Sequence, residues 1–215
     1  MSDIPNRALI VIDVQNEYIT GKLPIEYPNT LVSLSNIGRV MDAANTTSIP
    51  IIVVQHTLPE QAPVFAKGSK GWELNDVVMH RAHDFYVEKT QPSAFVGTNL
   101  ADWLSLHLID TITVVGYMTH NCIDSTIKHA QNIGLKTEFV ADAAGSLAYR
   151  NQIGAASAEE IHRTFTVVMQ SNFAAVTTTD QWITALKAGQ PLKRDNIYAS
   201  YSRSHTKAPT QPQNN

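Results

Sequence analysis

The chain has 215 residues, a formal net charge of −3 at pH 7 and one cysteine. This length suits one domain with a substantial core, the charge provides no basic surface for nucleic acid or anionic lipid, and a lone cysteine excludes an internal disulfide framework. The first seven residues lack the apolar core of a signal peptide, and no stretch has the length of a membrane span. We expect a cytoplasmic protein that binds neither nucleic acid nor membranes.

The first predicted strand covers residues 8–12, an unbroken apolar run that ends at Asp13. Unbroken apolarity is typical of a central strand in a parallel sheet that is covered on both faces. A carboxylate directly after such a strand lies in the crevice where α/β proteins bind ligands, although aspartate is also common as a turn or N-cap residue. Glycine and proline in residues 16–29 predict a loop, and a helix should begin at Asn29 or Thr30.

A second strand is predicted at residues 51–54 and is followed by a long loop over residues 57–83. So long a loop inside a compact domain is usually functional. A short third strand at residues 85–87 precedes Lys89. This lysine either enters the same crevice as Asp13 or is a solvated surface charge.

The only cysteine follows a fourth strand at residues 111–115, which Gly116 ends. Thr119 is a suitable N-cap for a helix predicted over residues 120–132, so Cys122 falls in the first helical turn. The partial positive charge at a helix N-terminus favours a thiolate, and this location indicates a nucleophile. The alternative is that Cys122 is a small buried hydrophobic residue.

Strands and helices continue to alternate along the rest of the chain, with strands predicted at residues 137–140 and 174–176 and helices at 157–170 and 179–187. This alternation predicts an α/β fold: a single three-layer α/β/α domain with a doubly wound, mostly parallel six-stranded sheet. We assign residues 1–188 to this domain. Residues 189–215 form a polar tail, either flexible or an arm packed on a neighbouring subunit.

Asp13, Lys89 and Cys122 each follow a predicted strand. Because all strands of a parallel sheet end at the same edge, we expect these three side chains to converge there. A carboxylate, an ammonium group and a thiol at one edge fit nucleophilic catalysis better than three unrelated structural roles.

The sequence resembles the isochorismatase-like cysteine hydrolases, a family that includes nicotinamidases and N-carbamoylsarcosine amidohydrolase. The resemblance covers residues 7–188 and implies a Rossmann-like, isochorismatase-like hydrolase fold and a homo-oligomer of two or four subunits. The matching segments, in chain order, are residues 8–16, Glu88-Lys89, residues 93–95, Val115-Gly116, Thr119, Cys122, residues 126–130, Gly134 and Asp142-Ala143.

The resemblance also implies a catalytic triad of Asp13, Lys89 and Cys122. Cys122 would attack an amide-type carbonyl as a thiolate favoured by Lys89 and the helix terminus, Asp13 would move the protons, and water would hydrolyse the thioester. The oxyanion hole would consist of the backbone N–H groups of Met118 and Cys122, oriented by a cis peptide bond between Tyr117 and Met118.

Two departures from related subtypes narrow this prediction. Related nicotinamidases bind a metal through an Asp-x-His pair beside the second strand, where this chain has Gln55-His56-Thr57, so we expect neither a metal nor another cofactor. True isochorismatases cleave a vinyl ether and carry a glycine at the position of Cys122, so the thiol favours hydrolysis of a C–N bond.

Three alternative functions are open at this point. The protein could hydrolyse a vinyl ether, or it could sense oxidants or bind a ligand through its thiol without turnover. A nucleotide-binding module would need a glycine-rich turn after the first strand, and residues 13–17 contain no glycine.

The residues expected around the substrate are mostly aromatic, which suits a small, flat, largely uncharged amide or ureido compound. His56 could contact substrate or be a hydrogen-bonded structural residue, and Phe65 and Trp72 could line the pocket or fix the long loop to the core. The full predicted set is Tyr18, His56, Phe65, Trp72, Phe95, Tyr117, His120 and Asn121. We expect a small-molecule substrate, whose identity the sequence does not specify.

Overall fold

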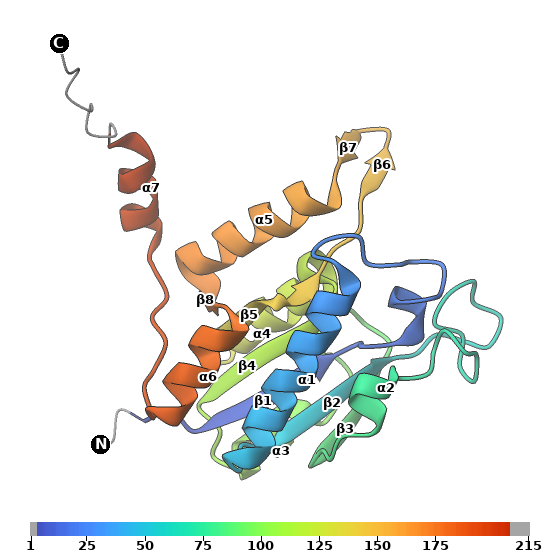
Figure 1. Cartoon of the computed structure of the whole chain (residues 1–215), viewed down its shortest axis with the longest axis horizontal. Helices are drawn as coiled ribbons and strands as arrows, with labels where there is room; N and C mark the ends of the chain where they lie inside the picture. Colours follow the sequence, from blue (N-terminus) through green and yellow to red (C-terminus); the bar gives the residue numbers. More distant parts are fainter. Residues whose placement is uncertain (1–3, 207–215) are drawn as a thin grey trace.

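The computed structural model describes residues 4–206, which form a central six-stranded sheet with helices on both faces (Figure 1). The strands lie in the order β3-β2-β1-β4-β5-β8, and every neighbouring pair is parallel. The predicted single-domain α/β fold with a doubly wound sheet is therefore confirmed. The strands are β1 Arg7–Ile12, β2 Ile51–His56, β3 Phe85–Lys89, β4 Thr111–Tyr117, β5 Lys136–Gly145 and β8 Ala175–Thr177.

The strand order changes direction between β1 and β4. The chain builds outward from β1 to β2 and β3, and then outward on the other side from β4 to β5 and β8. In an open parallel sheet, ligands bind in the crevice outside the carboxyl ends of the strands at such a switch point. Asp13 directly follows β1 and Cys122 comes shortly after β4, so both residues lie at this position.

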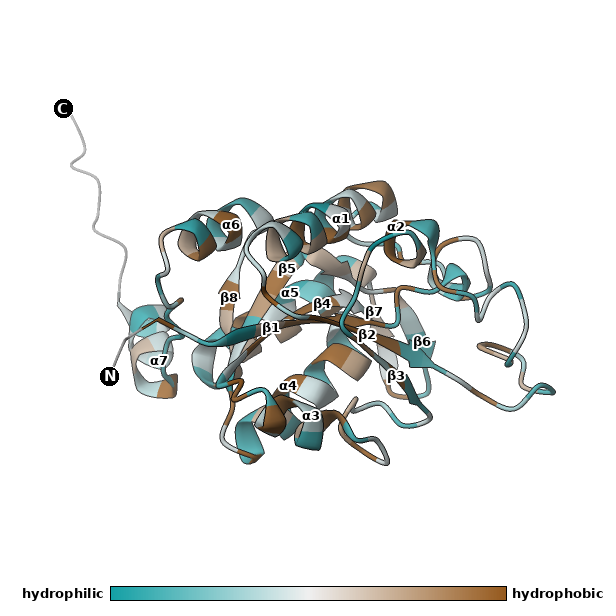
Figure 2. Ribbon diagram, turned by 90° about the horizontal axis from the view of Figure 1, so that it is seen from below, coloured by the Kyte–Doolittle hydropathy of each residue, from teal (hydrophilic) through white to brown (hydrophobic). Residues whose placement is uncertain are grey.

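Helices cover both faces of the sheet. Figure 2 shows α1 (Thr30–Thr46), α2 (Asp76–Met79) and α6 (Thr179–Lys187) on one face. On the other face lie α3 (Leu100–Leu106) and α4 (Asp124–Asn132), and α5 (Ala158–Val168) adds Phe165 to the apolar cluster there.

The unbroken apolar run of β1 has a direct explanation in these layers. All six residues of the strand are buried. Leu9 and Val11 belong to the cluster beneath α1, whereas Ala8, Ile10 and Ile12 belong to the cluster on the opposite face. Because both faces of the strand are covered, both sets of alternating side chains are apolar.

Several elements go beyond the sequence prediction. The short strand β5 predicted at residues 137–140 runs on to Gly145 after a shift of its register against β4. An antiparallel hairpin, β6 (Tyr149–Asn151) and β7 (Gly154–Ala156), precedes α5. One 3-10 helix, η1 (Asn16–Tyr18), and two π-helical turns, η2 (Thr119–Ile123) and η3 (Met169–Phe173), complete the set before the tail.

The segment predicted as a polar tail contains helix α7 (Ile197–His205), which projects from the body of the molecule (Figure 1). Its Ile197, Tyr198 and Tyr201 are 63%, 80% and 62% exposed.

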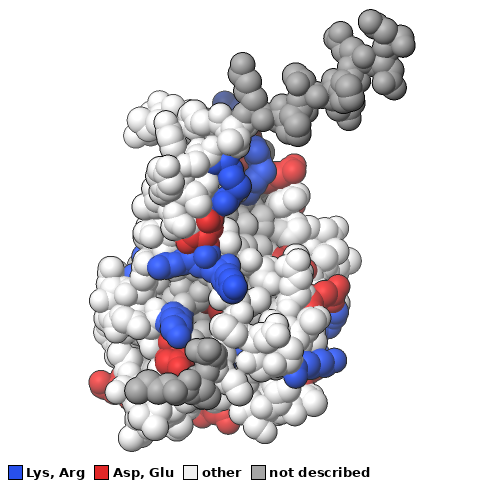
Figure 3. Space-filling view, turned by 90° about the vertical axis from the view of Figure 1, so that its left-hand side faces the viewer, with Lys and Arg blue, Asp and Glu red and all other residues white. Residues whose placement is uncertain are grey.

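On the side of the molecule shown in Figure 3, basic and acidic side chains lie beside one another. Residues 207–215 of the predicted tail lie outside the described residues. Within residues 4–206, no helix is both long and apolar enough to cross a membrane.

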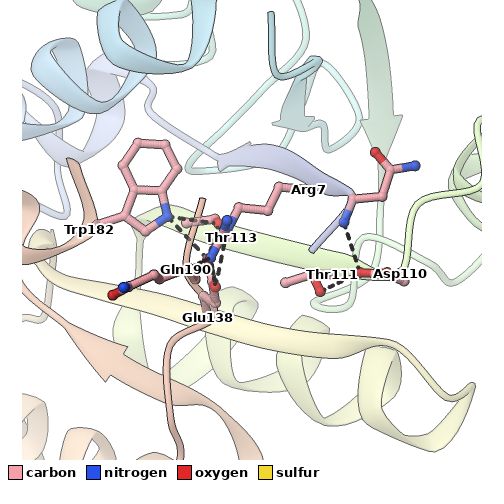
Figure 4. Close-up of polar contacts among 8 residues, drawn as sticks. Arg7, Asp110, Thr111, Thr113, Glu138, Trp182 and Gln190 are labelled. Atoms are coloured by element: carbon pink, nitrogen blue, oxygen red, sulfur yellow. Dashed lines mark hydrogen bonds and ion pairs between the residues drawn. The ribbon is translucent and has the colours of Figure 1, made fainter. Parts of the chain in front are cut away.

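A buried network of polar side chains connects β1, β4 and β5 near their amino ends (Figure 4). Arg7 of β1 pairs with Glu138 of β5 through Nε and Nη2, at 2.8–3.1 Å, and both side chains are almost fully buried. Glu138 also accepts hydrogen bonds from Thr113 Oγ1 and from Trp182 Nε1 of α6. Arg7 Nη2 donates to the Gln190 carbonyl at 2.6 Å. The network therefore holds the beginning of the C-terminal segment at the sheet edge opposite Asp13.

Candidate active site

The structure brings Asp13, Lys89 and Cys122 together at the carboxyl edge of the sheet. Lys89 Nζ lies 2.7 Å from Oδ2 of Asp13 and donates to Cys122 Sγ at 3.3 Å. The exposed fractions of the three residues are 0%, 1% and 4%. Their convergence follows from the topology, because each residue lies at or just beyond the end of a parallel strand.

Close approach of β1 and β4 fixes the position of Asp13. Gly116 of β4 has φ +112°, and a Cβ at this position would lie 2.0 Å from the Ile12 carbonyl oxygen. Only glycine therefore allows the two strands to meet in this way. Asp13 itself has φ 52°, a left-handed conformation that aspartate adopts more readily than most residues.

Cys122 lies in the π-helical turn η2, directly before α4. The prediction that Thr119 caps this helix is wrong, because its hydroxyl donates to the Gly145 carbonyl at 3.1 Å and lies 2.9 Å from His162 Nδ1. The Met118 carbonyl instead accepts the N–H groups of Asn121 and Ile123. Isolated π turns occur frequently at functional sites, and this one presents Cys122 toward Lys89.

The charge state of Cys122 differs from the prediction. Burial raises the pKa of the thiol and so does Asp13, whereas Lys89 lowers it, and the net shift is upward. The resting side chain is therefore a thiol and not the expected thiolate, since loss of solvation and the charge of Asp13 outweigh Lys89. Burial lowers the pKa of Lys89, but Asp13 and Cys122 together raise it by more, and the net shift is upward. Lys89 is therefore an ammonium group.

Asp13 has the surroundings of a proton acceptor. Its carboxylate is fully buried; Oδ2 lies 2.7 Å from Lys89 Nζ, whereas Oδ1 has no hydrogen-bond partner within residues 4–206. Buried carboxylates normally accept several such bonds, so free acceptor capacity in this position is unusual. The carboxylate can therefore receive a proton without first giving up another donor.

His56 is a fourth member of this cluster. Its Nδ1 lies 3.2 Å from Lys89 Nζ, and its ring meets Phe65 edge-on at 5.4 Å. Burial lowers the pKa of His56 and Lys89 lowers it further, while Asp13 raises it. The neutral ring accepts from Lys89 and orients it. Gln15, which the sequence did not single out, fixes the His56 backbone through both its amide atoms at 2.9 Å.

Tyr18 and Phe65 form a wall beside the triad, with ring centroids 5.0 Å apart. Burial raises the pKa of the Tyr18 hydroxyl, and the nearby Cys122 and Asp13 raise it further. Both residues therefore lie near Cys122 and Lys89, and their contact with substrate stays a prediction.

Three other predicted pocket residues belong to the packing instead. Tyr117 is fully buried and its hydroxyl lies 2.7 Å from Ser33 Oγ of α1. Phe95 is buried and stacks on His129 of α4. Trp72 donates from its indole to Thr57 Oγ1 and its carbonyl accepts from Gln15 and Gln55, so it holds the long loop in place.

His120 and Asn121 precede Cys122 in the same π turn, and both are partly buried. The His120 ring meets Tyr149 of β6 edge-on at 5.1 Å. The Tyr149 hydroxyl lies 3.9 Å from Met118 Sδ. Burial raises the pKa of this hydroxyl, and the nearby Cys122 raises it further. Sequence reasoning missed Tyr149, because residues 146–156 carry no periodic pattern that would place them at the site.

A family model for the isochorismatase domain matches residues 7–181. The chain belongs to the isochorismatase family. A crystal structure from Burkholderia xenovorans LB400, assigned as an isochorismatase, is 60% identical with a TM-score of 0.93, and the match covers 94% of this chain and 97% of that one. The isochorismatase family protein YrdC of Bacillus subtilis is 28% identical over 82% of this chain and 94% of its own length. Ureidoacrylate amidohydrolase of Acinetobacter baylyi is 25% identical over 87% of this chain and 86% of its own length.

The peptide bond between Tyr117 and Met118 of this isochorismatase-family protein is cis, as the resemblance implies. The side chains beside β2 do not fit the metal site of related nicotinamidases. Gln55 donates a hydrogen bond to the Trp72 carbonyl and accepts one from the Tyr86 hydroxyl. His56 Nδ1 lies next to Lys89 Nζ. Across the described part of the chain, no three His, Cys, Asp or Glu side chains are grouped to hold a metal ion.

Proposed function

We propose that this isochorismatase-family protein hydrolyses a C–N bond of a small amide, carbamoyl or ureido compound through a thioester on Cys122. One observation carries the proposal: a buried thiol beside a fixed ammonium group and a carboxylate whose Oδ1 has free acceptor capacity. The similarity to a ureidoacrylate amidohydrolase along most of both chains supports the same reaction class.

In the first half of the reaction, Asp13 accepts the thiol proton while Sγ forms a bond to the substrate carbonyl carbon. The raised pKa of Cys122 suits this order, because the thiol is neutral until the attack. The backbone N–H groups of Met118 and Cys122 would stabilise the oxyanion. Asp13 then returns the proton to the leaving nitrogen as the C–N bond breaks.

In the second half, water attacks the thioester carbonyl. Asp13 accepts a proton from this water as a general base, the C–S bond breaks, and the proton returns to the sulfur. Lys89 keeps its own proton throughout and holds the carboxylate and the sulfur in place, as its contacts to both suggest.

The competing functions fit these surroundings less well. Cysteine oxidation follows thiolate character and exposure, whereas Cys122 is 4% exposed and has a raised pKa, so a redox sensor is disfavoured. Vinyl-ether hydrolysis needs no thiol at this position.

The test is release of ammonia or amine from a panel of small amides, carbamoyl and ureido compounds. Wild type is compared with Cys122→Ala and Asp13→Asn, each with and without a chelator. We expect release that requires both residues and ignores the chelator, together with a thioester adduct detected by mass spectrometry of the quenched wild type. Release that survives Cys122→Ala would contradict the thioester route.

We also propose that the chain assembles as a homo-oligomer through α7. Its Ile197 and Tyr201 lie one helical turn apart, beside Tyr198, on a helix that projects from the body. Exposed apolar side chains of this size are typical of a surface that another subunit covers. Removal of residues 196–215 leaves the Arg7 network intact and should lower the mass measured by light scattering, whereas an unchanged mass would refute this role.

A further inference from the structure

A cavity of about 610 Å³ opens beside His120, which lies two residues before Cys122 in the η2 turn. We call it the His120 pocket. It is formed by the η2 turn, the β6–β7 hairpin and α5, and its volume lies within the range of small-molecule sites. No charged side chain of the described residues lines it. The lining residues are His120, Tyr149, Asn151, Ile153, Gly154, Ala155, Ala156, Ile161 and Phe165.

The pocket lies on the side of the reacting centre. His120 is two residues before Cys122 in the same π turn, and the Tyr149 hydroxyl is 3.9 Å from the sulfur of Met118. A substrate whose carbonyl carbon is at Cys122 would extend its substituent past His120 into this pocket, where the rings of Tyr149 and Phe165 meet the His120 ring edge-on.

His120 carries an unused polar atom at this position. Its Nε2 is buried and has no hydrogen-bond partner among the side chains and backbone of residues 4–206. Its Nδ1 lies 3.0 Å from Ser146 Oγ, which fixes the ring orientation. Buried polar atoms are normally bonded, so an orphaned atom in a cavity wall points to a ligand.

The hydrogen-bond inventory determines which atom carries the proton. The Ser146 hydroxyl is fully buried, and its contact among the described residues is His120 Nδ1. A proton on Nδ1 would leave both the serine O–H and the Nε2 lone pair without partners. A proton on Nε2 lets the serine donate to Nδ1 and leaves one unsatisfied group, the Nε2–H donor.

The charge of the ring is also defined. Burial lowers the pKa of His120, and the nearby His162 lowers it further, to about 4. The ring is therefore neutral at pH 7 and offers one hydrogen bond without a positive charge. Its lining, within the described residues, holds no cation that would favour a carboxylate over a neutral oxygen.

We infer that His120 determines specificity: its Nε2–H donates to a neutral oxygen, such as a carbonyl, on the substrate substituent that occupies the His120 pocket. The inference rests on the proposed C–N hydrolysis and names its substrate class. The substrate is an uncharged amide or ureide whose apolar substituent, up to a ring in size, carries a second oxygen acceptor.

The activity test uses three amides of matched shape, with a carbonyl, a methylene group or a carboxylate at the same position of the substituent. For wild type we expect kcat/KM to be at least about tenfold higher for the carbonyl compound than for the methylene compound, and lowest for the carboxylate. His120→Phe keeps a ring but removes the donor, and should abolish the preference for the carbonyl compound over the methylene compound. His120→Gln, which restores an N–H, should recover part of it. The matched control is His83→Phe. His83 is exposed and lies outside the residues that line the His120 pocket.

A preference that survives His120→Phe, or a wild type that favours the carboxylate, would overturn the inference while leaving C–N hydrolysis in place. If wild type cleaves none of the three amides but releases ammonia or amine from other compounds of the wider panel, the inference alone fails; no release from any compound of that panel overturns the proposed function as well.

A second measurement needs neither turnover nor a folded His120→Phe variant. Correlation spectra of ¹⁵N-labelled imidazoles report the tautomer of each histidine, and Ser146→Ala identifies the His120 signal. We expect the proton on Nε2 at pH 7, and an Nδ1 proton would overturn the inference.

Discussion

Replacing Lys89 by methionine would break a fully buried ion pair. The Lys89 ammonium lies 2.7 Å from the Asp13 carboxylate, and both side chains are 0% exposed. Removing one partner of such a pair costs about 3–5 kcal/mol, because the other charge is left buried and uncompensated. We expect Lys89→Met to lower the free energy of unfolding by about this amount at pH 7.5, and to abolish amide hydrolysis.

The assay is urea denaturation of Lys89→Met, of the double variant Asp13→Asn/Lys89→Met and of a surface control. The double variant has no uncompensated charge and should recover at least about 2 kcal/mol relative to Lys89→Met. The control, Lys67→Met, breaks the solvent-exposed pair with Glu88 at 2.9 Å and should cost no more than about 1 kcal/mol.

Unfolding at alkaline pH gives an independent measure of the contribution of Lys89 to stability. The pKa of Lys89 is raised in the folded protein, so its contribution is complete below the unfolded pKa of about 10.4 and is lost as the pH rises through the folded value. Wild type should therefore lose stability above that pH by a component that Lys89→Met lacks. A Lys89→Met variant no less stable than Lys67→Met, or a double variant without recovery, would refute this reasoning.

Three further predictions concern the frame around the site. Gly116→Ala should destabilise the protein by more than about 3 kcal/mol in urea unfolding, because its Cβ would lie 2.0 Å from the Ile12 carbonyl oxygen at a φ of +112°; a loss below 1 kcal/mol would mean that β1 and β4 can separate. Burial lowers the pKa of His162 to about 4, below its unfolded value of about 6.5, so its stabilising contribution is present above pH 6.5 and is lost as the pH falls toward 4. His162→Phe should reduce that acid-induced loss by about 3 kcal/mol, and equal losses in both proteins would contradict it. Arg7→Met should cost about 3–5 kcal/mol by leaving Glu138 buried and unpaired, yet leave kcat of the folded enzyme unchanged because the pair is at the opposite sheet edge; a changed kcat would show that the two edges are coupled.

The sequence determined the sheet and its functional edge. The unbroken apolar run before Asp13 predicts a strand covered on both faces, and β1 divides its side chains between two cores. The convergence of Asp13, Lys89 and Cys122 follows equally well, because in a parallel sheet the position of a strand end depends on chain direction and not on side-chain detail. The apolar pattern predicts each strand, and the order of the strands along the chain predicts which strand ends meet.

Only the tertiary structure decided how the residues at that edge behave. Cys122 is a thiol because burial and Asp13, which follows another strand, outweigh Lys89. Thr119 bonds to Gly145 and His162 instead of capping its own helix, and Tyr117 points into the α1 layer. A pKa and a hydrogen-bond partner depend on distances between segments far apart in the chain, and these distances exist only once the layers have packed.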